Sequence, residues 1–385
     1  MKEIATKNPE KLNSIGSASD SVPFSTIFTG LLFANLFYWA SNQYVIQRTL
    51  GAKNLAEGQK GVIISGFYKL LVPFMMMLPG VIAFHLYGDS LKSVDLAYPA
   101  LINAVLPSYL TGFFLAVLLG AVLSSFNSLL NSAATLFALD IYKPQFNPGV
   151  SDQKLITISK WFGALLAVVS MCVSPLLINA TDGLWDLIRR FTGFFNIPII
   201  VVLLVGVFSK RIPALAAKTV IILHVITYYM LVWGTGHLFG FTIDINFIHI
   251  YGILFVAEVA LMLVIGWWKP MKKPYEYRYN PKVDMMPWKY SLPLSIVLMA
   301  SVVLTYFIFS PIGLAYESAV ISPYFWPATG GLFLLTAGLI VWSLKSWNQK
   351  YRTYLLKNKT YKLNRTKKYS IQPNLNPIYS TKLLK

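Results

Sequence analysis

The stretch that decides the fold covers residues 104–139 and reads AVLPSYLTGFFLAVLLGAVLSSFNSLLNSAATLFAL. It contains no charged residue, and a helix needs about 20 mainly apolar residues to cross ~30 Å of hydrocarbon. The stretch therefore predicts a membrane-spanning helix. It is longer than a straight span requires, with Gly120 near its middle, which indicates a helix that is tilted or buried against other helices. Small polar residues follow that glycine: Ser124, Ser125, Asn127, Ser128, Asn131 and Ser132.

Similar apolar stretches recur along the whole chain. Of its 385 residues 56% are hydrophobic and only 12% are charged, about half the charged share of a typical soluble domain. We therefore expect an all-α, polytopic membrane protein. The nine predicted spans lie near residues 24–47, 61–87, 104–139, 158–179, 184–208, 212–234, 246–268, 290–310 and 326–344.

Several function classes are excluded by what the sequence lacks. The single cysteine, Cys172, rules out a disulfide framework, and no Cys/His spacing is typical of zinc. We expect the four histidines at interfaces or in loops. No P-loop, GxSxG or HExxH motif occurs, which argues against an ATP-driven pump and against an enzyme. No metal other than an alkali cation is expected.

The net charge of +18 is a signal of membrane topology. The basic residues alternate with apolar spans, so they form no continuous face for a nucleic acid. One set of alternate connections carries most of them, including residues 48–60, 143–160, 210–218, 269–289 and the chain from Lys345 onward. The opposite connections carry only Lys92, although the opening segment adds Lys2, Lys7 and Lys11.

This asymmetry places the first set and the C-terminus in the cytoplasm. We therefore predict a multi-pass protein of the cytoplasmic (inner) membrane, with the lipid bilayer as partner and no indication of oligomeric state.

The expected organisation has four parts. Residues 1–21 form a loop-like extracytoplasmic segment, and 22–208 form five transmembrane helices. Residues 209–345 add about four more, and 346–385 form a basic, solvated cytoplasmic tail that can touch anionic lipid.

Ionisable side chains inside a span are functional candidates by default because burying them costs several kcal/mol. Lys69 lies ~13 Å into the second span, and snorkelling to the interface is the alternative. Arg189 and Arg190 lie about two turns from the outer start of the fifth span and one turn from Asp186, so a local ion pair is expected for one of them. Adjacent residues point ~100° apart on a helix, so the other arginine can face a cavity.

One face of the third span gathers oxygen atoms. Ala121, Ser124 and Ser125 fall at i, i+3 and i+4, which places a carbonyl and two hydroxyls at one level. Neutral oxygens of this kind can replace the hydration shell of an alkali cation. The alternative is that each serine bonds to its own i−4 carbonyl or to a neighbouring helix.

The first span carries a polar aromatic group. Asn35, Tyr38 and Trp39 share one face and suit a polyhydroxylated or other polar organic ligand, with rings that stack and an amide that orients. An interfacial aromatic belt is the alternative.

Three segments together resemble the sodium:solute symporter family, which includes bacterial sodium/galactose and animal sodium/glucose cotransporters. They are NLFYWASNQYVIQRTLGAKNLAEGQKG (35–61), FYKLLVPFMMMLPGVIAFHLY (67–87) and AVLSSFNSLLNSAATLFALDIY (121–142). The resemblance covers about residues 10–290. It implies sodium-coupled symport of a small polar organic solute, of sugar or sugar-acid type, with Na+ as coupling ion.

The resemblance also implies roles for individual positions. The sodium ligands fall on Ala121, Ser124 and Ser125, and a second sodium, present in some members, would use Asn127 and Ser128. The solute-binding positions fall on Asn35, Tyr38, Trp39, Lys69 and Arg189, with Tyr38 at the gate.

Two departures from the family pattern matter. An arginine, Arg189, stands where a glutamine contacts sugar, which favours an anionic solute. The family fold consists of two inverted five-helix repeats, and spans one to five match the second repeat alone, followed by peripheral helices. We therefore expect a chain that is incomplete without an N-terminal half. The alternative to transport is a membrane-embedded sensor that binds the solute without moving it.

Overall fold

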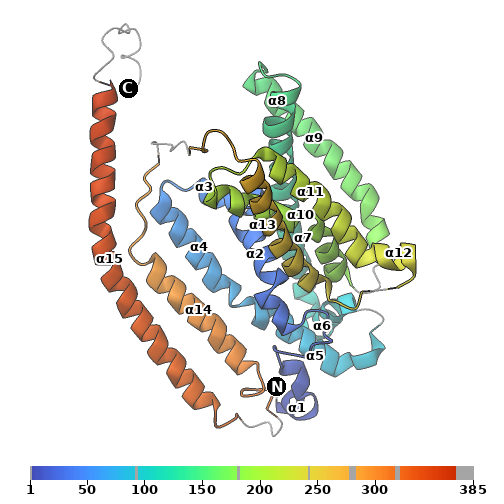
Figure 1. Ribbon diagram of the computed structural model, residues 1–385. Helices are drawn as coiled ribbons and strands as arrows, with labels where there is room; N and C mark the ends of the chain where they lie inside the picture. Colours follow the sequence, from blue (N-terminus) through green and yellow to red (C-terminus); the bar gives the residue numbers. More distant parts are fainter. Residues whose placement is uncertain are drawn as a thin grey trace.

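The computed structural model describes residues 2–91, 94–179, 183–241, 243–276, 283–316 and 321–369 (Figure 1). Within these residues every regular element is helical, and eight helical stretches are long and apolar enough to cross a membrane. The prediction of an all-α polytopic membrane protein is confirmed. The stretches run over Leu55–Tyr87, Ser108–Gln145, Asp152–Leu177, Leu184–Phe208, Ala214–Phe239, Phe247–Trp268, Ser291–Ile308 and Phe325–Leu355.

Helix breaks and short helical turns divide these stretches further. The main helices are α4 (Leu55–Lys69), α5 (Leu78–Tyr87), α6 (Ala97–Val105), α7 (Ser108–Leu136), α8 (Lys143–Gln145), α9 (Asp152–Val173), α10 (Leu184–Phe208), α11 (Ala214–Tyr229), α12 (Thr235–Phe239), α13 (Phe247–Trp268), α14 (Ser291–Ile308) and α15 (Phe325–Tyr369).

The first predicted span is not one continuous helix. Its apolar part forms α2 (Gly30–Ala40), whose 11 residues reach only ~16 Å. Ser41 Oγ donates to the Phe37 carbonyl (2.9 Å), and Asn42 Oδ1 accepts from Tyr44 N (3.3 Å) to cap α3 (Gln43–Leu50). The prediction of one helix over 24–47 is therefore wrong, because side chains at 41 and 42 end one helix and start another.

Helices α2, α10, α11 and α13 form the packed core. Gly30 on α2 faces the backbone of Ile248, and Phe33 stacks on Phe255 with 3.5 Å between ring centroids. The fully buried side chains of this core are Ala34, Ile197, Val201, Ala216, Val220, Tyr228, Ile248, Tyr251 and Met262.

Helices α7 and α9 form a hairpin that projects beyond this core (Figure 1). Phe137 stacks on Phe162 at 3.9 Å, and Ala138, Val150 and Leu155 form a small buried cluster at its end. No residue in the most apolar stretch of either helix is buried. The hairpin therefore presents most of its surface outward within the described structure.

Helices α14 and α15 lie on the other side, with α14 between α4 and α15 (Figure 1). Helix α15 continues without a break to Tyr369. The predicted tail from residue 346 therefore begins as a helix, and its part beyond 369 lies outside the described residues.

The basic connections share one end of the molecule. Figure 1 shows α3, α8 and the far end of α15 at this end, while α1 (Lys2–Lys7), α5 and α6 lie at the opposite end. Tyr275 N donates to the Lys210 carbonyl (2.8 Å) and Leu55 N to the Asp284 carbonyl (3.0 Å), which ties these connections together. The grouping predicted from charge is thus present, while Lys92 lies outside the described residues.

The opening segment is partly helical and is anchored. Ile4 and Leu12 are buried, and Ser14 N donates to the Phe309 carbonyl (2.7 Å) at the end of α14.

We predict that Gly30→Ala destabilises the protein. The new methyl group would lie 1.8 Å from the Ile248 carbonyl oxygen and 2.4 Å from Tyr251 Cβ, so α2 and α13 must separate. Overpacking of this kind costs about 1–3 kcal/mol. The measurement is the melting temperature in detergent. Gly331→Ala on α15, where nothing lies within 4 Å, is the matched control and should melt no lower than wild type. Equal melting temperatures for the two variants would contradict the packing.

Candidate functional site

The first turns of α10 separate two adjacent arginines. Arg190 Nε donates to Asp186 Oδ2 (2.5 Å), and its guanidinium lies 4.7 Å from the centroid of the Phe247 ring. Asp186 is buried, so this pair neutralises a carboxylate that would otherwise be costly inside the bundle. The predicted local ion pair belongs to Arg190, which leaves Arg189 outside it.

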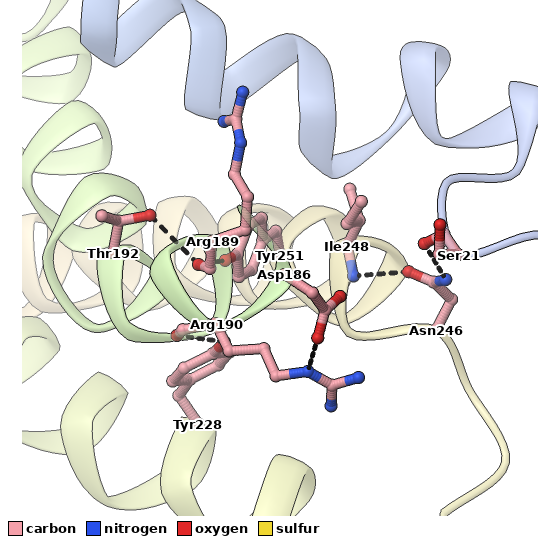
Figure 2. Close-up of polar contacts among 9 residues, drawn as sticks. All are labelled: Ser21, Asp186, Arg189, Arg190, Thr192, Tyr228, Asn246, Ile248 and Tyr251. Atoms are coloured by element: carbon pink, nitrogen blue, oxygen red, sulfur yellow. Dashed lines mark hydrogen bonds and ion pairs between the residues drawn. The ribbon is translucent and has the colours of Figure 1, made fainter. Parts of the chain in front are cut away.

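Arg189 points in a different direction. In Figure 2 its side chain extends toward the blue N-terminal part of the chain, whereas Arg190 lies beside Asp186. Its guanidinium lies 5.1 Å from the Trp185 ring centroid, and α10 packs against α2. Arg189 is therefore the arginine that a solute beside α2 can meet.

The residues predicted to bind solute on α2 and α4 lie together. Lys69 Nζ lies 4.9 Å from the Trp39 ring centroid, and the Tyr38 ring meets Trp39 edge-on at 5.1 Å. The Tyr38 and Tyr44 hydroxyls are hydrogen-bonded. Asn35 is half-buried and bonds to no described side chain, so its amide is free to orient a ligand. No hydrogen bond or ion pair among the described residues joins Arg189 to this group.

The predicted sodium ligands lie on an outward face of α7. Ser125 Oγ donates to the Ala121 carbonyl (3.1 Å), the local bond that any membrane serine can form. This bond uses the hydroxyl hydrogen and leaves lone pairs on both oxygens. Ser124 Oγ forms no hydrogen bond with a described residue, and all three positions are exposed. The face can therefore present three oxygens to one small cation.

Arg48 occupies the second predicted sodium position. Its Nη2 donates to Ser128 Oγ (2.8 Å), and Ser128 Oγ donates to the Ser124 carbonyl (2.9 Å). A second sodium at Asn127 and Ser128 would have to displace this guanidinium, because two cations repel each other at one oxygen.

Two functional candidates were missed at the level of sequence. His224 and Glu258 are buried, and His224 Nδ1 lies 2.5 Å from Glu258 Oε1. The expectation of an interfacial or loop position is wrong for His224, because this carboxyl partner lets a polar ring lie inside the bundle. The available signal was Glu258 itself, a carboxyl group twelve residues into an otherwise apolar helix.

A polytopic helical bundle with polar side chains between its helices is the architecture of many membrane transporters. In the described residues no group of three or more His, Cys, Asp or Glu side chains could hold a metal ion. The model of the sodium:solute symporter family matches residues 1–223, more than half of the chain. The chain belongs to this family, whose members are transporters and not enzymes.

Individual relatives agree with this assignment. The chain is 44% identical over 289 residues to the uncharacterized symporter YidK of Escherichia coli (strain K12), covering 75% of this chain and 49% of the relative. It is 35% identical over 220 residues to the sodium/glucose cotransporter of Vibrio parahaemolyticus (53% and 39%). It is 29% identical over 301 residues to sodium/glucose cotransporter 1 of Mus musculus (70% and 44%). The chain thus spans about half or less of the length of these relatives.

We predict that Asp186→Asn destabilises the protein and that Arg189→Gln leaves its stability almost unchanged. Asp186→Asn leaves the Arg190 guanidinium without a countercharge, which costs about 1–3 kcal/mol for this partly exposed pair. Arg189→Gln breaks no ion pair and should change stability by less than about 0.5 kcal/mol. Melting temperatures of the two variants in detergent test this. A larger loss for Arg189→Gln would show that the two arginines have exchanged roles.

Proposed function

We propose that the chain forms part of a sodium-coupled symporter for a small polar organic solute of sugar or sugar-acid type. One structural observation carries this proposal: the short helix α3 bonds to both candidate groups. Arg48 on α3 bonds to Ser128 beside the oxygen cluster of α7, and Tyr44 on α3 bonds to Tyr38 beside Trp39 and Lys69. A cation bound on α7 and a solute bound at α2 would therefore both affect the contacts of the same eight-residue helix, α3.

The proposed sodium site uses the Ala121 carbonyl with Ser124 and Ser125. These are neutral oxygens, which bind an alkali cation weakly enough for it to leave again. Sodium binding stabilises an outward-open state in this proposal, since a ligand shifts an equilibrium toward the state that it binds better.

The proposed solute site lies between α2, the α4–α5 stretch and α10. Asn35, Trp39 and Lys69 contact the solute, Tyr38 closes over it, and Arg189 approaches from α10. Because two of these side chains are cations, the site favours a carboxylated or otherwise anionic solute over a neutral hexose. Two of the relatives carry glucose in their names, and Arg189 is the reason to expect a different preference here.

The proposed setting is the cytoplasmic membrane with the C-terminus inside. The grouping of basic connections at one end of the bundle supports it.

We predict that Ser125→Ala abolishes sodium-stimulated solute uptake in cells that express the whole reading frame encoding this chain. The change removes one coordinating oxygen and leaves the helix intact. The measurement is solute accumulation in vesicles under an imposed sodium gradient. Ser170→Ala is the matched control, because Ser170 makes the same bond to an i−4 carbonyl (2.8 Å) on exposed α9 and has no proposed ligand role. Unchanged sodium dependence in Ser125→Ala contradicts the site, and binding without accumulation contradicts symport.

We predict that Arg189→Gln lowers uptake of a carboxylated sugar about tenfold or more, because it removes a charge-assisted hydrogen bond. Uptake of the matching neutral hexose should be unchanged or improved. Competition between a uronate and its parent hexose in the same vesicles measures the ratio. A ratio equal to that of wild type would remove Arg189 from the solute site.

A further inference from the structure

A buried ionisable pair lies at the centre of the helical bundle, away from the oxygen cluster of α7. His224 on α11 contacts Glu258 on α13 (Nδ1 to Oε1, 2.5 Å) and the Gly193 carbonyl on α10 (Nε2 to O, 3.0 Å). The side chain of His224 is 0% exposed and that of Glu258 is 6% exposed. Glu258 is the twelfth residue of the 22-residue helix α13, which places it about midway across the membrane.

The contacts of His224 indicate how many protons the His224–Glu258 pair holds. The Gly193 carbonyl can only accept, so Nε2 must carry a hydrogen. Nδ1 and the Glu258 oxygen 2.5 Å away can approach each other only with a second proton between them, since two lone pairs at this distance repel. The observed geometry therefore requires one proton in addition to the one on Nε2.

The second oxygen of Glu258 indicates where that proton resides. Oε2 is buried and has no hydrogen-bond partner among the described residues. An unpartnered carboxylate oxygen inside a membrane costs far more than the carbonyl oxygen of a neutral carboxyl group. A neutral carboxyl group that donates to Nδ1 therefore fits these surroundings better than a carboxylate.

The neighbouring charged groups are otherwise engaged. On α10, Asp186 pairs with Arg190 and Arg189 points toward the N-terminal part of the chain. On α11, Lys218 is exposed, and on α13, His249 bonds to Thr29 and Ser25. The tyrosines at this level, Tyr228 and Tyr251, donate to the carbonyls of Arg190 and Arg189, and on α2 Tyr38 bonds to Tyr44. None of these described groups forms an ion pair with His224 or Glu258.

We propose that His224 and Glu258 form a proton-binding site in the interior of the bundle. The bound proton joins α13 to α11, and through Nε2 of His224 both helices are held to the Gly193 carbonyl of α10. When the proton leaves, the neutral ring keeps one N–H, which can serve either Glu258 or the Gly193 carbonyl but not both, so one of the two links between these helices is lost. The site stands on geometry alone and does not depend on symport or on the sodium ligands.

The test compares wild type with Glu258→Gln. The amide NH2 of glutamine donates to Nδ1 as the protonated carboxyl group does, but it cannot release a proton. In the unfolded chain an exposed carboxyl group has already released its proton at neutral pH. A proton held only by the folded state therefore adds stability at low pH, and this contribution is lost as pH rises.

We expect the melting temperature of wild type in detergent to fall by at least about 3 °C more than that of Glu258→Gln between about pH 6 and pH 9. His85→Gln is the matched control, because His85 is a histidine near a carboxyl group at the membrane edge, with Nε2 3.9 Å from Glu3 Oε1. It should keep the wild-type slope. Equal slopes for wild type and Glu258→Gln would overturn the proposal.

A second measurement needs only the wild-type protein. The infrared difference spectrum between the same two pH values should show loss of a protonated-carboxyl C=O band at high pH. The absence of such a loss would overturn the proposal even if Glu258→Gln failed to fold. Both measurements are made without a sodium gradient, so they are decided separately from the symport experiments.

Discussion

The structure depends on how α10 is held by its neighbouring helices inside the membrane, where buried polar groups must bond to one another. Three side chains from α11 and α13 donate to it: Tyr251 to the carbonyl of Arg189, Tyr228 to that of Arg190 and His224 to that of Gly193. They can approach because residue 193 has no side chain; a Cβ there would lie 2.5 Å from the Tyr228 hydroxyl. Pro198 follows, and because it has no N–H it leaves the Phe194 carbonyl without its usual i+4 donor. The three outside donors thus tie α10 to α11 and α13 just before this break.

This support also decides the roles of the two arginines. The donors hold the carbonyls of residues 189 and 190 from the α11 and α13 side, so the rotation of α10 about its axis is fixed. Arg190 then lies beside Asp186 and Phe247, and Arg189, about 100° away, lies on the side of α2. The proposed preference for an anionic solute therefore rests on residues in helices that contact no solute. Helices expected to be peripheral additions are part of what positions the candidate site.

Local features were predictable from sequence, and distant pairings were not. Long apolar stretches predicted the eight spanning helices, and spacing predicted the Asp186–Arg190 pair, because both depend on neighbours along the chain. The end of α2 was missed because apolar residues resume at Tyr44, although the capping residue Asn42 carried a signal. His224 and Glu258, by contrast, are 34 residues apart in the sequence and lie on two different helices. A single sequence shows that each of these polar side chains is costly to bury in a membrane, but it does not show that the two side chains bond to each other.

The two halves of the candidate site differ in how completely the described residues enclose them. The α10 side is packed among α2, α11 and α13, whereas the oxygen cluster on α7 faces outward. Helix α3 connects the two sides by one bond at each end, Arg48 to Ser128 and Tyr44 to Tyr38. In the proposed mechanism α3 moves as a unit, so a displacement of α7 relative to α2 would strain one of these bonds. Both bonds are exchangeable with ligands: a cation near Ser128 repels Arg48, and a solute hydroxyl can replace the Tyr44 hydroxyl on Tyr38. In the proposed symporter, occupancy of one group would therefore change the cost of moving the other, which is what coupling an ion to a solute requires.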